Sequence, residues 1–201
     1  MANRSYLYSI EKEKLSKGLS ECNYFIPLAF EILVSADTKM VKSKLFDSDE
    51  NICLQGNLKE GVQKLNKFID ELYKTRIINI PKLQDQINQT KNFFNTLDGE
   101  FIYLDACEVY AMDVDESEFL QKNRKEFENI KNIDKEISKY LISLEKSLDE
   151  YFSLKNKLPY KGLFAKIRNK KTEENLNIIE NQISNLLCFD YWGQPLYYDV
   201  D

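Results

Sequence analysis

The side chains best suited to chemistry in this chain are carboxylates, and they gather in one stretch. No basic residue lies between Lys91 and Lys122, and the acidic residues there are Asp98, Glu100, Asp105, Glu108, Asp113, Asp115, Glu116 and Glu118. Two nearby carboxylates can form the acid–base pair of a glycosidase or hold a Mg²⁺ ion. The spacing lacks the Asp-x-Asp-x-Asp-Gly pattern of a calcium loop. A solvated acidic face is the plainer interpretation.

The composition closes most other routes to catalysis. The chain has no histidine, which removes Ser-His-Asp and Cys-His nucleophiles and histidine-based zinc sites. Its six glycines form neither a phosphate loop nor a dinucleotide-binding motif. The cysteines are widely spaced, as is typical of buried hydrophobes in a reducing compartment; they are Cys22, Cys53, Cys107 and Cys188. We therefore expect no enzyme, no catalytic residue, no metal and no cofactor, with a carboxylate-based enzyme as an alternative.

A second charged stretch is basic. Between Glu150 and Glu173 the charged residues are Lys155, Lys157, Lys161, Lys166, Arg168, Lys170 and Lys171. Tyr160 and Phe164 lie among them and could stack on bases. A nucleic-acid-associated protein that uses segment 155–171 is therefore a further alternative. The net charge of −5 and a pI near 5.1 favour a solvated loop instead, so no nucleic acid is expected as a partner.

Aromatic residues cluster near both ends of the chain, at Tyr6, Tyr8, Tyr191, Trp192, Tyr197 and Tyr198. Such a set can form a box that stacks on a ligand. The preferred interpretation is that they are strand residues that cap a helical core.

Hydrophobic periodicity predicts the elements that position these groups. Alternation or short apolar runs predict strands at 4–10, 52–54 and 100–104. Spacing of three and four predicts helices at 26–34, after Asn57, from Pro81 toward Gly99 and at 172–187, with a shorter one over 37–46. Gly18 and Ser20 are expected to break the chain, and the tail to form a turn around Gly193 and Pro195 between two extended pieces.

The longest stripe, from Glu116 to about Asn156, predicts one long helix or two with a kink near Asn132. Segment 116–157 is expected to form a protruding helical hairpin or an extended arm. Together these patterns predict one globular domain over 1–201, of α+β class and predominantly helical. Its helical core would pack on a small sheet that includes 4–10 and 100–104.

The sequence shows no targeting signal, which predicts a cytoplasmic protein. The first ten residues contain no apolar run of the length found in signal peptides. No window approaches the roughly 18 apolar residues that a membrane span needs. We expect no membrane association.

Several segments resemble an uncharacterised bacterial protein family. The matching pieces are the opening MANRSYLYS, residues 26–35, 61–68, 103–112 and 191–198. The family has no assigned activity, so the resemblance implies no functional residues. In size, acidity and lack of catalytic motifs the chain is similar in type to immunity proteins, which neutralise antibacterial toxins by binding them.

The functional hypothesis is a non-enzymatic protein-binding module, an immunity protein whose partner is a cognate bacterial toxin. An acidic face can steer association with a basic toxin cleft, and aromatic or Met side chains can anchor it. The expected contact residues are Asp98, Glu100, Tyr103, Asp105, Glu108, Tyr110, Met112, Asp113, Asp115, Glu116 and Glu118. The toxin's chemistry and the oligomeric state stay open.

Overall fold

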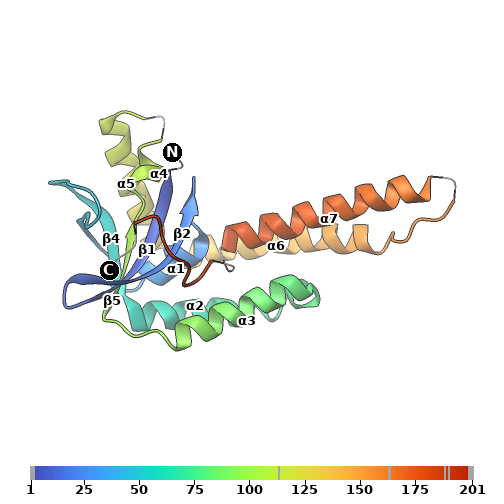
Figure 1. Ribbon diagram of the computed structural model, residues 1–201, viewed down its shortest axis with the longest axis horizontal. Coiled ribbons are helices and arrows are strands. Elements are labelled where there is room, and N and C mark those ends of the chain that lie inside the picture. The colour runs from blue at the N-terminus through green and yellow to red at the C-terminus, as the bar shows by residue number, and fades with distance from the viewer. Residues whose placement is uncertain (1–2, 113, 163, 188, 190, 199–201) are drawn as a thin grey trace.

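The computed structural model describes residues 3–198 except 113, 163, 188 and 190. In this part of the chain, seven α-helices and one 3₁₀ turn accompany a five-stranded antiparallel sheet (Figure 1). The strands are β1 (Arg4–Glu11), β2 (Lys14–Asn23), β3 (Lys39–Lys42), β4 (Asn51–Asn57) and β5 (Phe101–Asp105). The helices are α1 (Leu28–Val34), α2 (Leu58–Leu72), η1 (Arg76–Asn79), α3 (Pro81–Asn95), α4 (Cys107–Tyr110), α5 (Glu116–Lys131), α6 (Ile133–Lys155) and α7 (Ala165–Leu187). The predicted α+β, predominantly helical class is confirmed.

Local signals place several helix ends correctly. The Asn57 side chain accepts a 3.0 Å hydrogen bond from the Glu60 amide and so caps α2. Pro81 is the first residue of α3, where a missing N–H costs nothing. Pro27 immediately precedes α1 in an extended conformation.

The sheet order is β2-β1-β5-β4-β3, so the predicted strands at 4–10 and 100–104 pair directly. Tyr8 lies opposite Tyr103, and Leu7 lies opposite Leu104. Because side chains alternate along a strand, the sheet has two different faces. One face carries Leu7, Leu54 and Leu104 and joins the main core beneath the helices, whereas the other carries Tyr6, Tyr8, Cys53 and Tyr103.

Helices α1 and α2 lie close against the first face, and their approach depends on glycine. A Cβ added to Gly61 of α2 would lie 2.0 Å from the Leu33 carbonyl oxygen of α1. A Cβ added to Gly56 at the end of β4 would lie 2.3 Å from the Val34 carbonyl oxygen. Glycine therefore sets how near the helical layer can come to the sheet.

Two predictions about the first fifty residues are wrong. The segment 37–46, expected as a short helix, contains β3 and the turn that follows it. Its pairing partner is β4, with Met40 opposite Leu54. Gly18 and Ser20 do not break the chain, because β2 runs through both and absorbs the irregularity as a register shift beside Gly18.

The long apolar stripe from Glu116 forms two helices, α5 and α6, which meet at Asn132. This is the second of the two predicted alternatives, two helices with a kink near Asn132. The protruding hairpin, however, is built from α6 and α7 instead of residues 116–157. Figure 1 shows these two helices side by side and projecting away from the sheet. Helix α7 begins at Ala165, earlier than the predicted Thr172.

The C-terminal tail covers parts of the sheet. The Gly193 amide donates a 2.8 Å hydrogen bond to the Leu19 carbonyl of edge strand β2. The Tyr8 hydroxyl donates a 2.5 Å bond to the Tyr198 carbonyl on the second face. The described tail turns at Gly193 as expected but contains no strand. Among the described helices, none combines the length and apolarity that crossing a bilayer requires.

Candidate functional site

The predicted acidic surface does not form one continuous face. Tyr103 and Asp105 are fully buried on the second face of the sheet, and Tyr110 is only 6% exposed. These three residues follow the alternation of β5 and the inward face of α4, so they support the fold instead of facing a partner. Tyr103 and Tyr110 therefore do not provide surface anchors.

The other predicted contact residues occupy separate places. Asp98 and Glu100 are exposed just before β5, and Glu108 and Met112 are half-buried in and after α4. Asp115 and Glu118 are exposed at the start of α5. Asp113 lies outside the described residues, and Glu116 is placed only as the first residue of α5.

Asp115 has a structural task as well as a charge. Its carboxylate accepts hydrogen bonds from the Glu118 amide at 3.0 Å and the Ser117 hydroxyl at 2.8 Å. These bonds lower the pKa of Asp115 below its ordinary value, the Glu118 amide contributing most. Asp115 is thus the N-cap of α5.

A pocket of about 430 Å³ lies on the second face of the sheet. Its floor comes from four strands, through Ile10, Val41, Gln55 and Phe101. Its rim comes from the β1–β2 turn through Glu13, from β3 through Lys39 and Lys42, and from the segment after β3 through Ser43 and Lys44. This size is within the range of small-molecule sites.

The rim segment is fixed from below by buried polar groups. The Ser43 hydroxyl donates a 2.6 Å hydrogen bond to Asp105, and the Tyr103 hydroxyl donates one of 2.9 Å to the same oxygen. The Tyr103 oxygen in turn accepts a 2.8 Å bond from the Lys44 amide. Burial and the Asp105 carboxylate raise the pKa of Tyr103, so its hydroxyl remains a donor.

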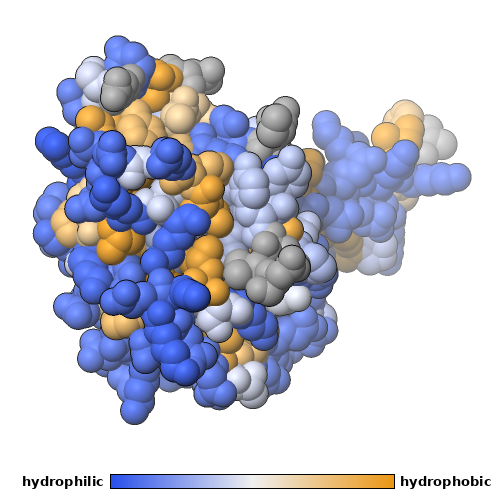
Figure 2. Space-filling view, turned by 60° about the vertical axis from the view of Figure 1, so that its left-hand side comes forward, coloured by the Kyte–Doolittle hydropathy of each residue, from blue (hydrophilic) through white to orange (hydrophobic). Residues whose placement is uncertain are grey.

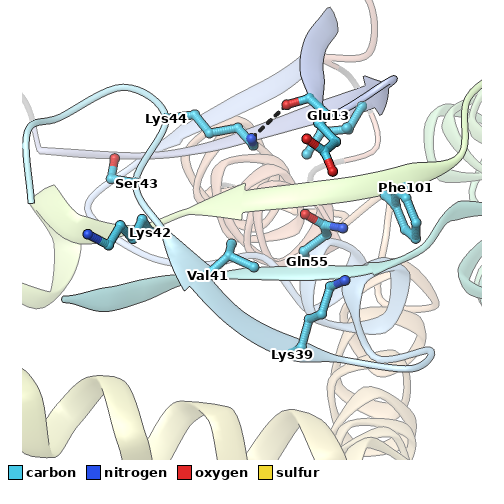
Figure 3. Close-up of a pocket in the computed structure, with 9 residues that line it drawn as sticks. Glu13, Lys39, Val41, Lys42, Ser43, Lys44, Gln55 and Phe101 are labelled. Carbon is cyan, nitrogen blue, oxygen red and sulfur yellow. Dashed lines mark hydrogen bonds between the residues drawn. The ribbon is translucent and has the colours of Figure 1, made fainter. Parts of the chain in front are cut away.

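The pocket is rich in positive charge (Figure 3). Lys39 lies over the Phe101 ring at 5.2 Å, and Lys44 Nζ donates a 2.8 Å hydrogen bond to the Glu13 carbonyl. Lys42 points outward, where it lies 3.6 Å from Asp49. Sequence reasoning missed this site, although Lys39, Lys42 and Lys44 are a visible local concentration of lysines.

Two thiols and a carboxylate meet below the rim segment. The sulfur atoms of Cys53 and Cys107 lie 3.6 Å apart, and each of these and an Asp105 oxygen lie within 4.8 Å of one another. The Cys107 amide also donates a 3.1 Å hydrogen bond to Asp105. The pKa of Cys107 is raised, mainly by its hydrogen bond with Cys53 and then by burial. Since Asp105 already accepts three hydrogen bonds within the fold, we interpret the group as a polar core.

Exposed tyrosines mark a different surface, beside edge strand β2. Tyr24, Tyr191 and Tyr197 are 58%, 56% and 55% exposed. Figure 2 turns the end of the molecule that carries the sheet toward the viewer, and hydrophobic side chains reach the surface there between hydrophilic areas. Tyr6, Tyr8 and Trp192 instead pack inward, so only part of the aromatic set forms the cap that the sequence predicts.

Contacts to Glu21 of β2 fix the tail at this surface. Its carboxylate lies 3.1 Å from the Arg4 guanidinium and accepts a 2.7 Å hydrogen bond from the Tyr197 amide. The Arg4 guanidinium lies 4.7 Å from the centre of the Tyr197 ring. Glu21, Tyr191, Gln194, Pro195 and Leu196 line a hollow of about 300 Å³. We call this set, with Tyr24 and Tyr197, the tyrosine surface.

The basic segment lies at the far end of the α6–α7 hairpin (Figure 1). Its seven lysine and arginine side chains are exposed, and the apolar Phe164 and Ile167 are exposed among them. Tyr160 is half-buried, and its amide donates a 2.7 Å hydrogen bond to Asn169. The structure thus separates the basic segment from the sheet.

The fold and its sites define an α+β protein with an antiparallel sheet, one helical layer and a projecting hairpin. The sequence model of a family described as "Domain of unknown function (DUF7822)" matches residues 9–147, and the chain belongs to this family. The match begins in β1 and ends within α6. It includes every residue that lines the pocket of Lys39, Lys42 and Lys44 on the second face of the sheet, which we call the lysine pocket. No curated protein and no solved structure shows significant similarity to the chain.

Proposed function

We propose that this protein is a non-enzymatic protein-binding module, an immunity protein that neutralises a cognate bacterial toxin. The observation that carries the proposal is the tyrosine surface. Tyrosine is enriched where proteins bind tightly, because it offers a large contact area for few rotatable bonds. Here two tyrosines lie on a tail held by the Glu21 carboxylate and the Leu19 carbonyl.

Rigidity supports the proposal further. A surface that is fixed before contact loses little entropy when a partner binds. The tail is held at both ends of its turn, through Trp192 and Tyr198. The Trp192 indole donates a 2.8 Å hydrogen bond to Thr90 and lies against Phe94, and the Tyr198 ring lies against Phe46.

The exposed part of the acidic run supports the same interpretation. Glu108 accepts hydrogen bonds from the Arg4 amide and the Tyr6 hydroxyl, so it lies next to the tyrosine surface. Asp115 and Glu118 lie at the start of α5, which follows shortly after α4. Exposed acidic side chains would favour a basic partner and accelerate encounter with it.

The test begins with the product of the neighbouring open reading frame. Its co-purification with this protein and its toxicity in the absence of this protein are the expected results. In the Tyr191→Ala, Tyr197→Ala double variant, the dissociation constant should rise by at least about tenfold, since anchors of this kind contribute about 1.4 kcal/mol or more.

The matched control is Phe164→Ala, which removes an equally exposed aromatic ring from the hairpin. It should bind like the wild type. Reversing the charge of Glu118, whose side chain does not cap α5, should slow association and reduce its salt dependence. If the double variant binds as tightly as the control, the tyrosine surface is not part of the interface. If no toxic partner is found, the immunity function is refuted.

A further inference from the structure

The lysine pocket has features that the fold does not explain. Gln55 is only 9% exposed, yet its amide forms no hydrogen bond with any described residue. Figure 3 shows that amide pointing into the pocket, between Glu13 and Lys39. Because the amide borders the open pocket, water or a ligand can complete its hydrogen bonds. The amide is therefore available to pair with a bound molecule.

The turn above the pocket is held in a strained conformation. Lys12 and Glu13 have φ values of 49° and 66°, in the left-handed region that hairpin turns usually fill with Asn or Gly. Non-glycine residues are uncommon in this region and occur preferentially at functional sites. The Lys44 side chain holds this turn by its bond to the Glu13 carbonyl. This turn carries the Glu13 side chain at the rim of the pocket.

The charge at the rim suits an anion. Lys39 and Lys44 face the pocket from opposite sides, and Glu13 is its one acidic residue (Figure 3). Lysine binds phosphate as a point charge, and the Gln55 amide can donate to a phosphate or to a ring. The apolar floor of Ile10 and Val41, with the half-buried Phe101 ring, offers a surface for a flat group.

We propose that this pocket binds a nucleoside monophosphate. Lys39 would turn from the Phe101 ring to the phosphate, which would lie between Lys39 and Lys44. The base would pack on the uncovered Phe101 ring and Val41, and Glu13 would accept hydrogen bonds from sugar hydroxyls or an exocyclic amine. The volume of about 430 Å³ accommodates one such molecule. This site is separate from the tyrosine surface and does not depend on the toxin-binding proposal.

Isothermal titration calorimetry of the full chain in phosphate-free, low-salt buffer tests the proposal. The probes are adenosine and guanosine 5′-monophosphate, inorganic phosphate and adenosine. At least one monophosphate should bind roughly tenfold or more tighter than phosphate or adenosine alone, as a stacked base and a paired phosphate together predict. Dissociation constants above about 1 mM for both monophosphates, a binding free energy weaker than about −4 kcal/mol, would overturn the proposal. Equal affinity for inorganic phosphate would refute the base-binding part.

Two variants and one control localise the binding. Lys39→Gln with Lys44→Gln should weaken monophosphate binding at least about tenfold, because two point charges are lost. Gln55→Leu, which keeps the side-chain volume similar, should also weaken monophosphate binding. It replaces the lysine variant as the test if that variant fails to fold. Lys59→Gln with Lys67→Gln makes the same charge change on the exposed side of α2 and should leave affinity unchanged. If the pocket variants bind as the wild type does, the ligand binds elsewhere.

Discussion

Ser43 and Asp105, far apart in the sequence, are joined by a 2.6 Å hydrogen bond from the Ser43 hydroxyl to the buried carboxylate. The same hydroxyl oxygen accepts bonds from the Phe46 and Leu45 amides, at 2.9 and 3.2 Å. One side chain therefore closes the turn after β3 and attaches it to β5. The position of the lysine pocket rim depends on this attachment.

Removing the Ser43 hydroxyl should loosen the rim segment. We expect Ser43→Ala to lower the free energy of unfolding by roughly 1.5–3 kcal/mol, the range for hydrogen bonds to charged groups. Urea unfolding followed by circular dichroism measures this change. Ser48→Ala, in the same segment but bonded only to nearby backbone, should change stability by less than about 0.5 kcal/mol. Equal effects of the two substitutions would contradict the proposed anchor.

Glu31 makes stability depend on pH. Its carboxyl group lies against Glu126 and near Glu136, and its pKa is raised to about 9, by burial first and by Glu126 next. Between the ordinary value of 4.5 and about 9, the folded protein keeps a proton that the unfolded chain releases. The contribution of Glu31 therefore becomes increasingly unfavourable as the pH rises through this window.

Glu31→Gln removes that penalty. At about pH 7.5 we expect the substitution to raise the free energy of unfolding by up to roughly 4 kcal/mol, and the gain should nearly vanish near pH 4, where both states are largely protonated. Unfolding curves at several pH values provide the measurement. Glu150→Gln, an exposed glutamate of α6, should show no such pH dependence. A gain that is the same at both ends of the window would show that packing, and not ionisation, is responsible.

Gly61 tests the packing of α2 on α1. Alanine is the better helix former, but its Cβ would lie 2.0 Å from the Leu33 carbonyl oxygen. We expect Gly61→Ala to destabilise the protein by roughly 1–3 kcal/mol, as overpacked sites do. Thermal unfolding checks this, with Gln63→Ala on the exposed side of the same helix as the control. A stabilised Gly61→Ala variant would mean that the helices can separate at little cost.

The hairpin end provides a test of the nucleic-acid alternative. Exposed lysines at one tip supply few phosphate contacts, and binding to phosphates weakens steeply with salt. We expect no gel shift of short DNA or RNA at physiological ionic strength. Micromolar binding that Lys166→Ala with Arg168→Ala abolishes, while Lys59→Ala with Lys67→Ala preserves it, would instead support nucleic-acid binding.

Local sequence determined the parts of the fold whose causes lie within a few residues. The Asn57 cap, the Pro81 start and the spaced apolar stripes are such features, because a cap or an amphipathic face forms between near neighbours. The β1 and β5 segments were also recognisable from their alternation. The resemblance to an uncharacterised family is consistent with the family match over residues 9–147, but it says nothing about a site.

Tertiary structure decided what depends on distant partners. Segment 37–46 contains a strand because β4 offers it an edge to pair with, and such pairing leaves little local signal. Tyr103 and Asp105 share one face of β5 by simple alternation, but the sequence does not say that the Ser43 turn covers that face. The acidic run was therefore predicted as a surface, and part of it is buried. The lysine pocket combines four strands and two turns, so it exists only once the sheet has formed.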